Sequence, residues 1–503
     1  MKQVLHIFWK DVRLYWIEIL ASLSVSTLFV WLYPISWGDS PTISVWPWVP
    51  EATAVLLPVS WLVLITRVIH AESLVGQRQF WITRPYLWPQ LLAAKVLFIS
   101  AFVCVPFALA QCLLLREAGL HPLSHIAGVF YNTLMAIGIA VLPMAYLAAV
   151  TSNFGKTLLA VLGLILFVGG VAYLSSIVPT SGSIDFLTEL SFVAAVSVFV
   201  AVLLIQYSRR STSVSWALLG ALSVTFGAMA LAAPAEWEVK AVYPEHVAAT
   251  GPRLSLRPIG GTTFTTTSDT VDPREVTVGF PIEVTGIAPD SAVRVDDARV
   301  RFTSANGVRW VSYWQGATGT WTAGDPNGVV SLKVSRSFYE RMKDTPVTVE
   351  MSAALTYLKA GTVTRLTLPA DRFELPGGSM CRISGSWGND LSCLSPMRQP
   401  PLMLIGTRFT SEKCSAAPPS NDGDPGLAWV GTTDTDPAEF GLTSVWETKG
   451  WFERFSSSNS SQEQHLCPGS PLSIVRYNVV SRSQQTLVSQ PLTLKSLVSS
   501  PQM

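Results

Sequence analysis

Residues 70–95 hold the side chains whose types and spacing are most suggestive of a function. The preceding run 14–66 contains no Lys or Arg, whereas this stretch combines charge, aromatic rings and a proline break. Its candidate residues are Glu72, Gln79, Phe80, Trp81, Arg84, Pro85 and Lys95. Proline lacks an amide donor and restricts the residue before it, so Arg84 lies at a fixed break in the backbone. A rigid loop of this kind suits the transmission of force, and it equally suits the setting of membrane topology.

No pattern in the chain indicates catalysis. The His-Glu-x-x-His zinc signature and the Gly-x-Ser-x-Gly nucleophile signature are both absent. The segment Asn153–Thr157 ends like a phosphate-binding loop, but Val150 stands where that loop needs its first glycine. His246 beside Glu245 is typical of a surface pair. We therefore expect no catalytic residue, no metal site and no resident cofactor, and we do not expect the chain to be an enzyme by itself.

The six cysteines divide between the two halves of the chain. Cys104 and Cys112 lie in an apolar segment and are interpreted as small hydrophobic residues. The other four are confined to the polar C-terminal half, which indicates disulfides in an oxidising compartment. These are Cys381, Cys393, Cys414 and Cys467. We expect Cys381 to pair with Cys393 and Cys414 with Cys467, although four cysteines allow three pairings.

The composition indicates a membrane protein with more than one domain. Of 503 residues, 14% are charged and 49% are hydrophobic, and the net charge of +1 gives no electrostatic reason to expect nucleic acid as a partner. Seven apolar segments are long enough to cross a bilayer as helices, which takes about 20 residues. They lie near 15–36, 52–70, 93–115, 125–150, 156–178, 189–207 and 214–233, so the transmembrane domain spans 15–234.

The N-terminal segment 1–16 is expected to form an amphipathic helix on the membrane surface. Apolar residues recur at helical spacing, and Lys10, Asp11 and Arg13 are assigned to its polar side. If the spans alternate, the basic residues of the following segments all fall on one side of the membrane: the N-terminal segment, 67–95, Lys156, and Arg209 with Arg210. The positive-inside rule then makes the N-terminus cytoplasmic and places everything after the seventh span outside. We expect a multi-pass protein of a bacterial inner membrane. Ala233-Pro234-Ala235 also resembles a cleavage site, and the sequence leaves open whether the chain is cut there.

The wording of the 70–95 loop resembles that of ABC-2-type transporter permeases, the membrane subunits of ATP-binding-cassette exporters. That family often has an acidic residue, Gly, then Phe-Trp-x-Thr-Arg-Pro and a Leu-Leu-Ala-Lys helix start, which here are represented by Glu72, Phe80–Pro85 and Leu91–Lys95. The resemblance covers roughly 1–210. It implies a separate ATPase subunit that carries ATP and Mg, contacts the candidate residues of the loop and couples hydrolysis to transport. It also implies a second permease subunit, identical or not, in the same bilayer.

The C-terminal half is expected to be mainly β. Short alternating stretches are bounded by Gly, Pro, Asp and Asn, and Asn306-Gly307 between such stretches is a strong hairpin signal. We expect an extracytoplasmic β-sandwich of Ig-like architecture over 235–376, with a turn at Ala360-Gly361. A disulfide-containing region with a polar tail follows over 377–503.

Two functions fit these expectations. The first is the permease subunit just described, in which a seventh span and an outer domain depart from the usual six-span family pattern. The second is a membrane-anchored binding or sensor protein that acts through its outer β domain. Neither the transported substrate nor the role of the outer domain follows from the sequence.

Overall fold

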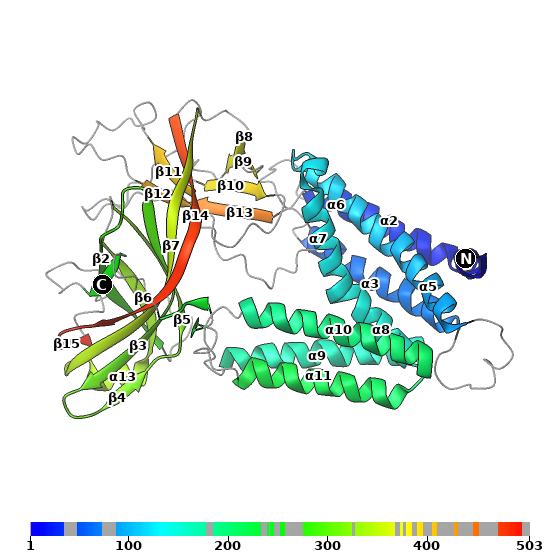
Figure 1. Ribbon diagram of the computed structural model, residues 1–503, viewed down its shortest axis with the longest axis horizontal. Helices are drawn as coiled ribbons and strands as arrows, with labels where there is room; N and C mark the ends of the chain where they lie inside the picture. The colour runs from blue at the N-terminus through cyan, green and yellow to red at the C-terminus, as the bar shows by residue number, and fades with distance from the viewer. Residues whose placement is uncertain are drawn as a thin grey trace. The chain divides into compact units, whose positions relative to one another are not determined.

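The computed structural model describes most of the helical half and the main strands of the β half (Figure 1). The described residues are 2–34, 48–72, 87–177, 185–232, 239–240, 242–245, 252–256, 275–323, 327–367, 373–375, 379–384, 390–395, 405–409, 427–430, 446–451 and 471–494. The chain divides into two units. The first comprises 1–170, 191–226 and 364–474, and the second comprises 171–190, 227–363 and 475–503.

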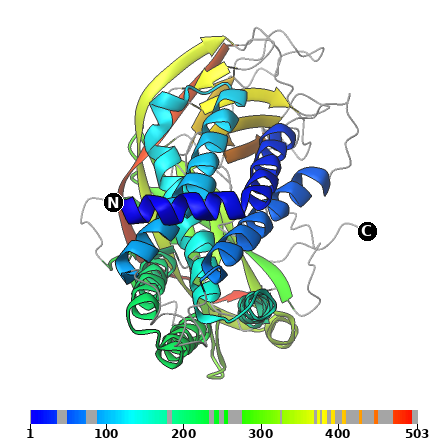
Figure 2. The same ribbon diagram turned by 90° about the vertical axis from the view of Figure 1, so that its right-hand side faces the viewer.

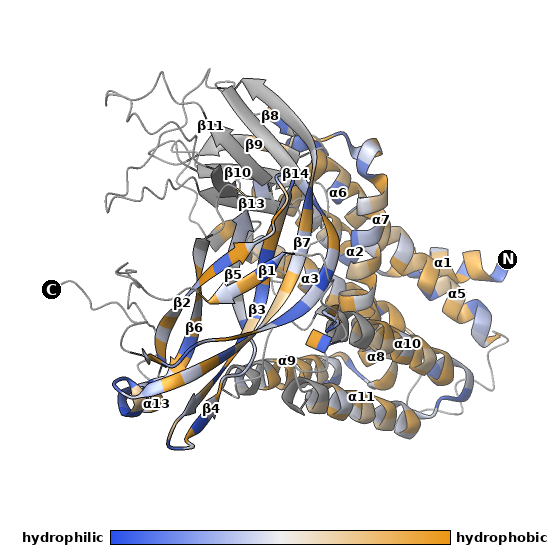
Figure 3. Ribbon diagram, turned by 60° about the vertical axis from the view of Figure 1, so that its left-hand side comes forward, coloured by the Kyte–Doolittle hydropathy of each residue, from blue (hydrophilic) through white to orange (hydrophobic). Residues whose placement is uncertain are grey.

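The helical part consists of long apolar helices, which are mostly orange in the hydropathy colouring of Figure 3. Among the described residues, five helices are long and apolar enough to cross a membrane by length and composition: 52–70, 88–117, 122–150, 154–171 and 192–209. A sixth arises if α1 (Lys2–Leu14) and α2 (Trp16–Leu32), which meet at a bend of 76°, count as one span. The chain is therefore membrane-embedded in character. The seventh expected span corresponds to α11 (Thr212–Ala232), which counts only as a shorter apolar helix.

Two of the long helices are interrupted by a wider π turn. The segment η2 (Ser100–Cys104) separates α5 (Trp88–Ile99) from α6 (Val105–Glu117), and η4 (Ile137–Val141) separates α7 (Ile126–Ala136) from α8 (Leu142–Val150). A proline follows each one, Pro106 and Pro143. Proline has no N–H for the carbonyl four residues earlier, and the wider turn accommodates the resulting gap.

Two hydrophobic cores organise the helices. The larger one joins α1, α2, α3 (Trp48–His70), α5, α6, α7 and α8, with Trp61, Phe98 and Leu114 nearly or fully buried. The smaller one joins α8, α9 (Phe154–Ile177), α10 (Asp185–Arg209) and α11 around Tyr146 and Val202. In the spanning window of α9 only 6% of residues are buried within the protein, which is the exposure expected of a helix whose apolar side faces lipid.

The β part contains two sheets that share one hydrophobic core. The first sheet has the order β1-β2-β6 (Arg253–Leu256, Glu275–Thr285 and Asn327–Ser335). In the second, β3 (Ser291–Ser304) pairs antiparallel with β4 (Arg309–Val311), β5 (Gln315–Thr322) and β7 (Pro346–Thr367). Strand β7 also neighbours β14 (Pro471–Val488) and pairs antiparallel with β15 (Leu492–Thr493).

The shared core draws alternate residues from both sheets, such as Phe280 from β2 and Phe302 from β3. The short helix α13 (Arg336–Met342) closes one end, where the ring of Phe338 stacks on Phe302 at 5.5 Å. A sandwich-like core is thus present, but the described strands do not show Ig-like closure. The Ig-like part of the expectation is not confirmed.

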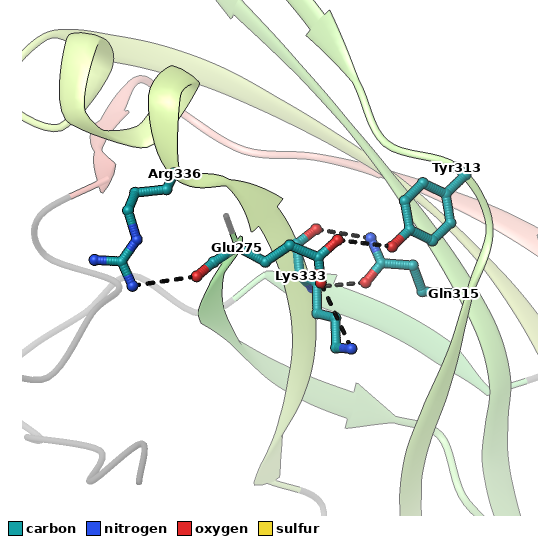
Figure 4. A network of polar contacts seen from close by, with 5 residues as sticks. All are labelled: Glu275, Tyr313, Gln315, Lys333 and Arg336. Carbon is teal, nitrogen blue, oxygen red and sulfur yellow. Dashed lines mark hydrogen bonds and ion pairs between the residues drawn. The ribbon is translucent and has the colours of Figure 1, made fainter. Parts of the chain in front are cut away.

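Polar contacts tie the edge of the first sheet to the chain entering β5 (Figure 4). The hydroxyl of Tyr313 donates to Oε1 of Glu275 at 3.1 Å, and the Gln315 amide bonds the backbone N–H and C=O of Lys333 at 2.6 and 2.7 Å. Lys333 Nζ also lies 3.5 Å from Glu275 Oε2. These contacts hold β2, β6 and the segment before β5 together.

The β half shows the outcome of two turn predictions and of the prediction for the end of the chain. The Asn306-Gly307 hairpin is confirmed, because Gly307 has a φ of 78° and Ser304 N–H bonds Val308 O at 3.0 Å between β3 and β4. The predicted turn at Ala360-Gly361 is wrong, because β7 runs through both residues without reversing. The end of the chain, predicted as a polar tail, continues as a strand through its described part, because β14 runs to Val488 and Leu494 is fully buried.

A further sheet has the order β13-β10-β9-β8 (Trp446–Trp451, Asp390–Ser395, Ser379–Ser384 and Phe373–Leu375). Its register places Cys381 of β9 directly opposite Cys393 of β10. The side chain of Cys393, and both Cys414 and Cys467, lie outside the described residues, so the two disulfide pairings stay predictions.

Candidate coupling site

The two ends of the 70–95 stretch are described, and its middle is not. Helix α3 ends at His70, with Glu72 two residues beyond, and α5 begins at Trp88. Residues 73–86 lie outside the described residues, and with them Gln79, Phe80, Trp81, Arg84 and Pro85. Of the predicted coupling residues, the structure therefore places Glu72 and Lys95.

Four charged side chains meet where these two ends come together against α1, and we call Lys10, Asp11, Glu72 and Lys95 the charge cluster. Lys10 Nζ lies 2.8 Å from Glu72 Oε1, and Lys95 Nζ lies 2.7 Å from Asp11 Oδ2. Asp11, Glu72 and Lys95 are 0%, 1% and 2% exposed, while the Lys10 side chain is 39% exposed. Each buried charge thus has an opposite charge beside it.

Burial makes these pairs a structural constraint. Removing one member of a buried pair leaves an uncompensated charge, which costs about 3–5 kcal/mol, although a well-packed apolar replacement of the whole pair is often neutral. The charge cluster therefore contributes specificity more than net stability. It fixes which residues of α1, α3 and α5 face one another.

Helix α1 thereby holds both ends of segment 73–86. Adjacent residues of α1 make the two contacts: Lys10 binds Glu72 at the entry to the segment, and Asp11 binds Lys95 in the helix that follows it. Apolar packing supports them, since Ile7 is buried in the same core as Leu91 and the ring of Phe8 stacks on Phe102 at 5.9 Å. Figure 2 shows α1 running crosswise in front of the bundle. Helix α1 thus links the chain just after α3 to α5.

The polar side assigned to α1 from the sequence is partly wrong. The sequence pattern places Asp11 on the polar side with Lys10 and Arg13, but Asp11 is completely buried, whereas the apolar Leu5 and Trp9 are 45% and 58% exposed. Helical spacing puts Asp11 four residues after Ile7, on the same face. A lysine from a distant helix makes its burial possible, and a local pattern does not reveal that lysine.

A second polar contact ties the end of α3 to the connection between α8 and α9. His70 Nε2 lies 2.9 Å from Ala148 O and 3.4 Å from Thr151 Oγ1. The hydroxyls of Thr151 and Thr157 are 2.6 Å apart, and both residues are buried. Thr157 ends the segment that imitates a phosphate-binding loop, and its hydroxyl is directed into this network.

Glu18, near the start of the first span, has a partner as well. Its Oε1 lies 3.6 Å from Nε of Arg67, with the two side chains 22% and 60% exposed. A pair with this exposure contributes little, about 0–1 kcal/mol. It nevertheless links α2 to the last turn of α3, close to the charge cluster.

Comparisons with protein-family models, with curated proteins and with solved structures found no match for the chain. Among the described residues, no group of three or more His, Cys, Asp or Glu side chains is arranged to hold a metal ion. His246 and His465, and the acidic residues Asp422, Asp424, Asp434 and Asp436, lie outside the described residues.

Proposed function

We propose that the chain is the transmembrane permease subunit of an ATP-driven ABC-2-type export system, energised by a separate ATPase subunit that contacts residues 70–95. In this proposal seven spans cross a bacterial inner membrane, the N-terminus is cytoplasmic and the β domain is extracytoplasmic. A second permease subunit, identical or not, completes the transporter. ATP and Mg are bound by the partner ATPase.

One observation carries the proposal: α1 is joined by ion pairs to Glu72, just before the 73–86 segment, and to Lys95 in α5, the helix that follows the segment. A connection that only set topology would need basic residues in water and no buried counter-charges. Here Asp11 and Glu72 are buried against Lys95 and Lys10, which makes the flanks of the segment one mechanical unit. Such a unit suits a loop that receives force from a partner protein.

The proposed roles divide between the flanks and the middle of the segment. Glu72 and Lys95 position the segment through the charge cluster, because their charged groups are directed at Lys10 and Asp11. Gln79, Phe80, Trp81, Arg84 and Pro85 would then form the surface that meets the ATPase. The positioning residues can therefore be tested by their effect on stability, and the surface residues by their effect on binding of the ATPase.

The test is purification of the tagged protein from its own host in mild detergent, with mass spectrometry of the proteins that accompany it. We expect a stoichiometric ATPase with a phosphate-binding loop. Arg84→Ala and the double variant Phe80→Ala/Trp81→Ala should lose this ATPase while the permease stays folded. Arg116→Ala is the matched control and should retain the ATPase, because Arg116 lies in the last turn of α6, at the end of that span opposite the loop 70–95.

The alternative function is a membrane-anchored binding or sensor protein that acts through its β domain. It predicts that no ATPase is recovered with the intact, folded protein. Loss of the ATPase in the Arg116 control as well would show that the detergent, rather than the loop, governs the association.

A further inference from the structure

A short segment after α11 is docked on the face of the second sheet turned away from the shared core. We call residues 239–245 the strap; its described residues are Val239, Lys240 and Val242–Glu245. Val239 is 5% exposed and packs with Trp314 and Ala354, which are also buried, in a small core that includes Tyr243. This core is separate from the one between the two sheets.

A β-bulge provides the strap with a polar anchor. The pairing of β3 with β5 and β7 shifts register between Val295 and Asp297, so Asp296 is the extra residue. Its carboxylate accepts hydrogen bonds from the hydroxyls of Tyr243, at 2.9 Å, and Thr356. Arg294 also bonds this carboxylate. Bulges commonly redirect a side chain at the cost of ladder pairing, and here the redirected carboxylate meets the strap.

Strand β14 contributes the remaining contacts. Gln484 N–H donates to Pro244 O at 3.2 Å, and the Arg482 guanidinium lies 5.8 Å from the centre of the Tyr243 ring. Burial, and next the Asp296 carboxylate, raise the pKa of Tyr243, so its hydroxyl remains a donor across the physiological pH range. The strap is therefore bound to β3, β7 and β14 together.

The docked strap is not fully complementary to the sheet beneath it. Among the described residues, Trp314 Nε1 is buried but has no hydrogen-bond acceptor, and the same holds for Nε of Arg482. A buried donor without an acceptor costs about 1–3 kcal/mol. Release of the strap would expose these groups to water, which offsets part of the docking energy.

The strap lies between α11 and β1, so its docking determines how much chain is free to join them. Helix α11 ends at Ala232 and β1 begins at Arg253. With the strap docked, only residues 233–238 join α11 to a point fixed on the β domain, a reach of at most roughly 25 Å at about 3.5 Å per residue. With the strap released, residues 233–252 span at most roughly 75 Å.

We propose that the strap is a length switch: docking on the Asp296 bulge holds the β domain close to the outer end of α11, and undocking lets it move away. This goes beyond the proposed transport function and needs no ATPase. It assigns the outer domain two states that differ in how far it reaches from the membrane helices.

The experiment uses the full chain in lipid nanodiscs without nucleotide. Spin labels on unnatural amino acids at Val224 of α11 and Val308 of the β3–β4 hairpin, both exposed, report the distance between the two parts. The strap is loosened by Tyr243→Phe, and more strongly by Val239→Asp combined with it. Tyr313→Phe is the matched control. It removes a tyrosine hydroxyl that donates a hydrogen bond of similar length to a carboxylate, Glu275, which lies outside the strap.

We expect amide exchange in the strap to rise about five- to tenfold in Tyr243→Phe, as loss of one hydrogen bond predicts, with the shared core unchanged. In the double variant the distance distribution should broaden and lengthen by roughly 10 Å. The control should match the wild type in both readouts. Fast amide exchange of the strap in the wild type would overturn the proposal. So would an unchanged distance distribution in a variant whose amide exchange shows that the strap is released. Recovery or loss of the ATPase bears on the transport proposal alone.

Discussion

At the scale of single residues, the buried charges of the α1–α3–α5 junction are the most informative feature. Charges in or near a membrane are costly, and they persist where partners and function require them. Asp11 and Lys95 are both almost completely buried and 2.7 Å apart, so each depends on the other. The Glu18–Arg67 pair lies nearby, but it is far more exposed. These two pairs provide a direct comparison of buried and exposed ion pairs within one helical bundle.

Lys95→Met should destabilise the protein strongly, because Asp11 would be left buried without its counter-charge. We expect a loss of about 3–5 kcal/mol, measured as a lower unfolding temperature in detergent. Asp11→Leu/Lys95→Met should recover most of this loss, since the whole pair is then replaced by apolar groups. Arg67→Met, the matched control in the exposed pair, should cost at most about 1 kcal/mol. Equal effects of the two methionine substitutions would contradict the structural role of the charge cluster.

Sequence reasoning found half of the charge cluster. Glu72 and Lys95 match the family wording of the loop, whereas the spacing within α1 predicts Lys10 and Asp11 on the polar side of a surface helix. The pairs join residues separated by 62 and 84 positions. Periodicity within one helix carries no information about such partners, so the clustering could be seen only once the helices were packed.

At the scale of elements, local chemistry predicted most of the described helices and strands and failed where tertiary pairing decided. Asn306-Gly307 formed its hairpin because Gly307 adopts the positive φ that the turn needs. Gly361 does not adopt a positive φ, and β7 extends through it. The bulge at Asp296 was not predicted either. The β3 residues of the shared core have odd numbers up to Val295 and even numbers from Ala298 onward, which is the shift that a bulge produces. That change of parity is a signal that sequence reasoning could have used.

The glycines of the helices give a prediction at this scale. A Cβ on Gly138, within the π turn η4, would lie 2.5 Å from the Phe192 ring, whereas a Cβ on Gly163 of α9 would meet nothing within 4 Å. Gly138→Ala should therefore destabilise by about 1–3 kcal/mol through overpacking. Gly163→Ala should stabilise by up to about 1 kcal/mol, because alanine is the better helix former. Thermal unfolding in one detergent measures both, and a stabilising Gly138→Ala would contradict the close contact between η4 and α10.

At the scale of the whole molecule, the cysteines and the membrane spans bear on the same question, namely on which side of the membrane the β half lies. Cys381 and Cys393 face each other across β9 and β10, where directly opposite Cα atoms of an antiparallel pair lie about 4.5–5.5 Å apart. That separation suits a disulfide. A disulfide would persist in an oxidising compartment and would be reduced in the cytoplasm.

We expect peptide mass spectrometry without reductant to recover Cys381 linked to Cys393. Cys381→Ser should then lower stability by about 3 kcal/mol, the value typical of a short closed loop. Cys104→Ser, in an apolar helix, is the control that should leave the linkage pattern unchanged. Recovery of both cysteines as free thiols from carefully quenched cells would contradict the pairing and weaken the case for an extracytoplasmic β half.

The parity of the spans decides the same question independently. Five helices qualify, a sixth requires the bent pair α1–α2 to cross as one span, and α11 is short by the same measure. If all seven cross and the N-terminus is cytoplasmic, residues after Ala232 lie outside; if α11 does not cross, they lie inside.

Alkaline phosphatase fused after Leu494 should be active if all seven spans cross, since that enzyme needs its disulfides. A fusion after Arg210, between α10 and α11, should be inactive as its control. The reverse result, an active fusion after Arg210 and an inactive one after Leu494, would place the β domain and its strap in the cytoplasm. The loop 70–95 would then lie on the outer side of the membrane, across the span 88–117 from Arg116. The positive-inside argument and the proposed ATPase contact would then fail together, because both depend on that loop facing the cytoplasm.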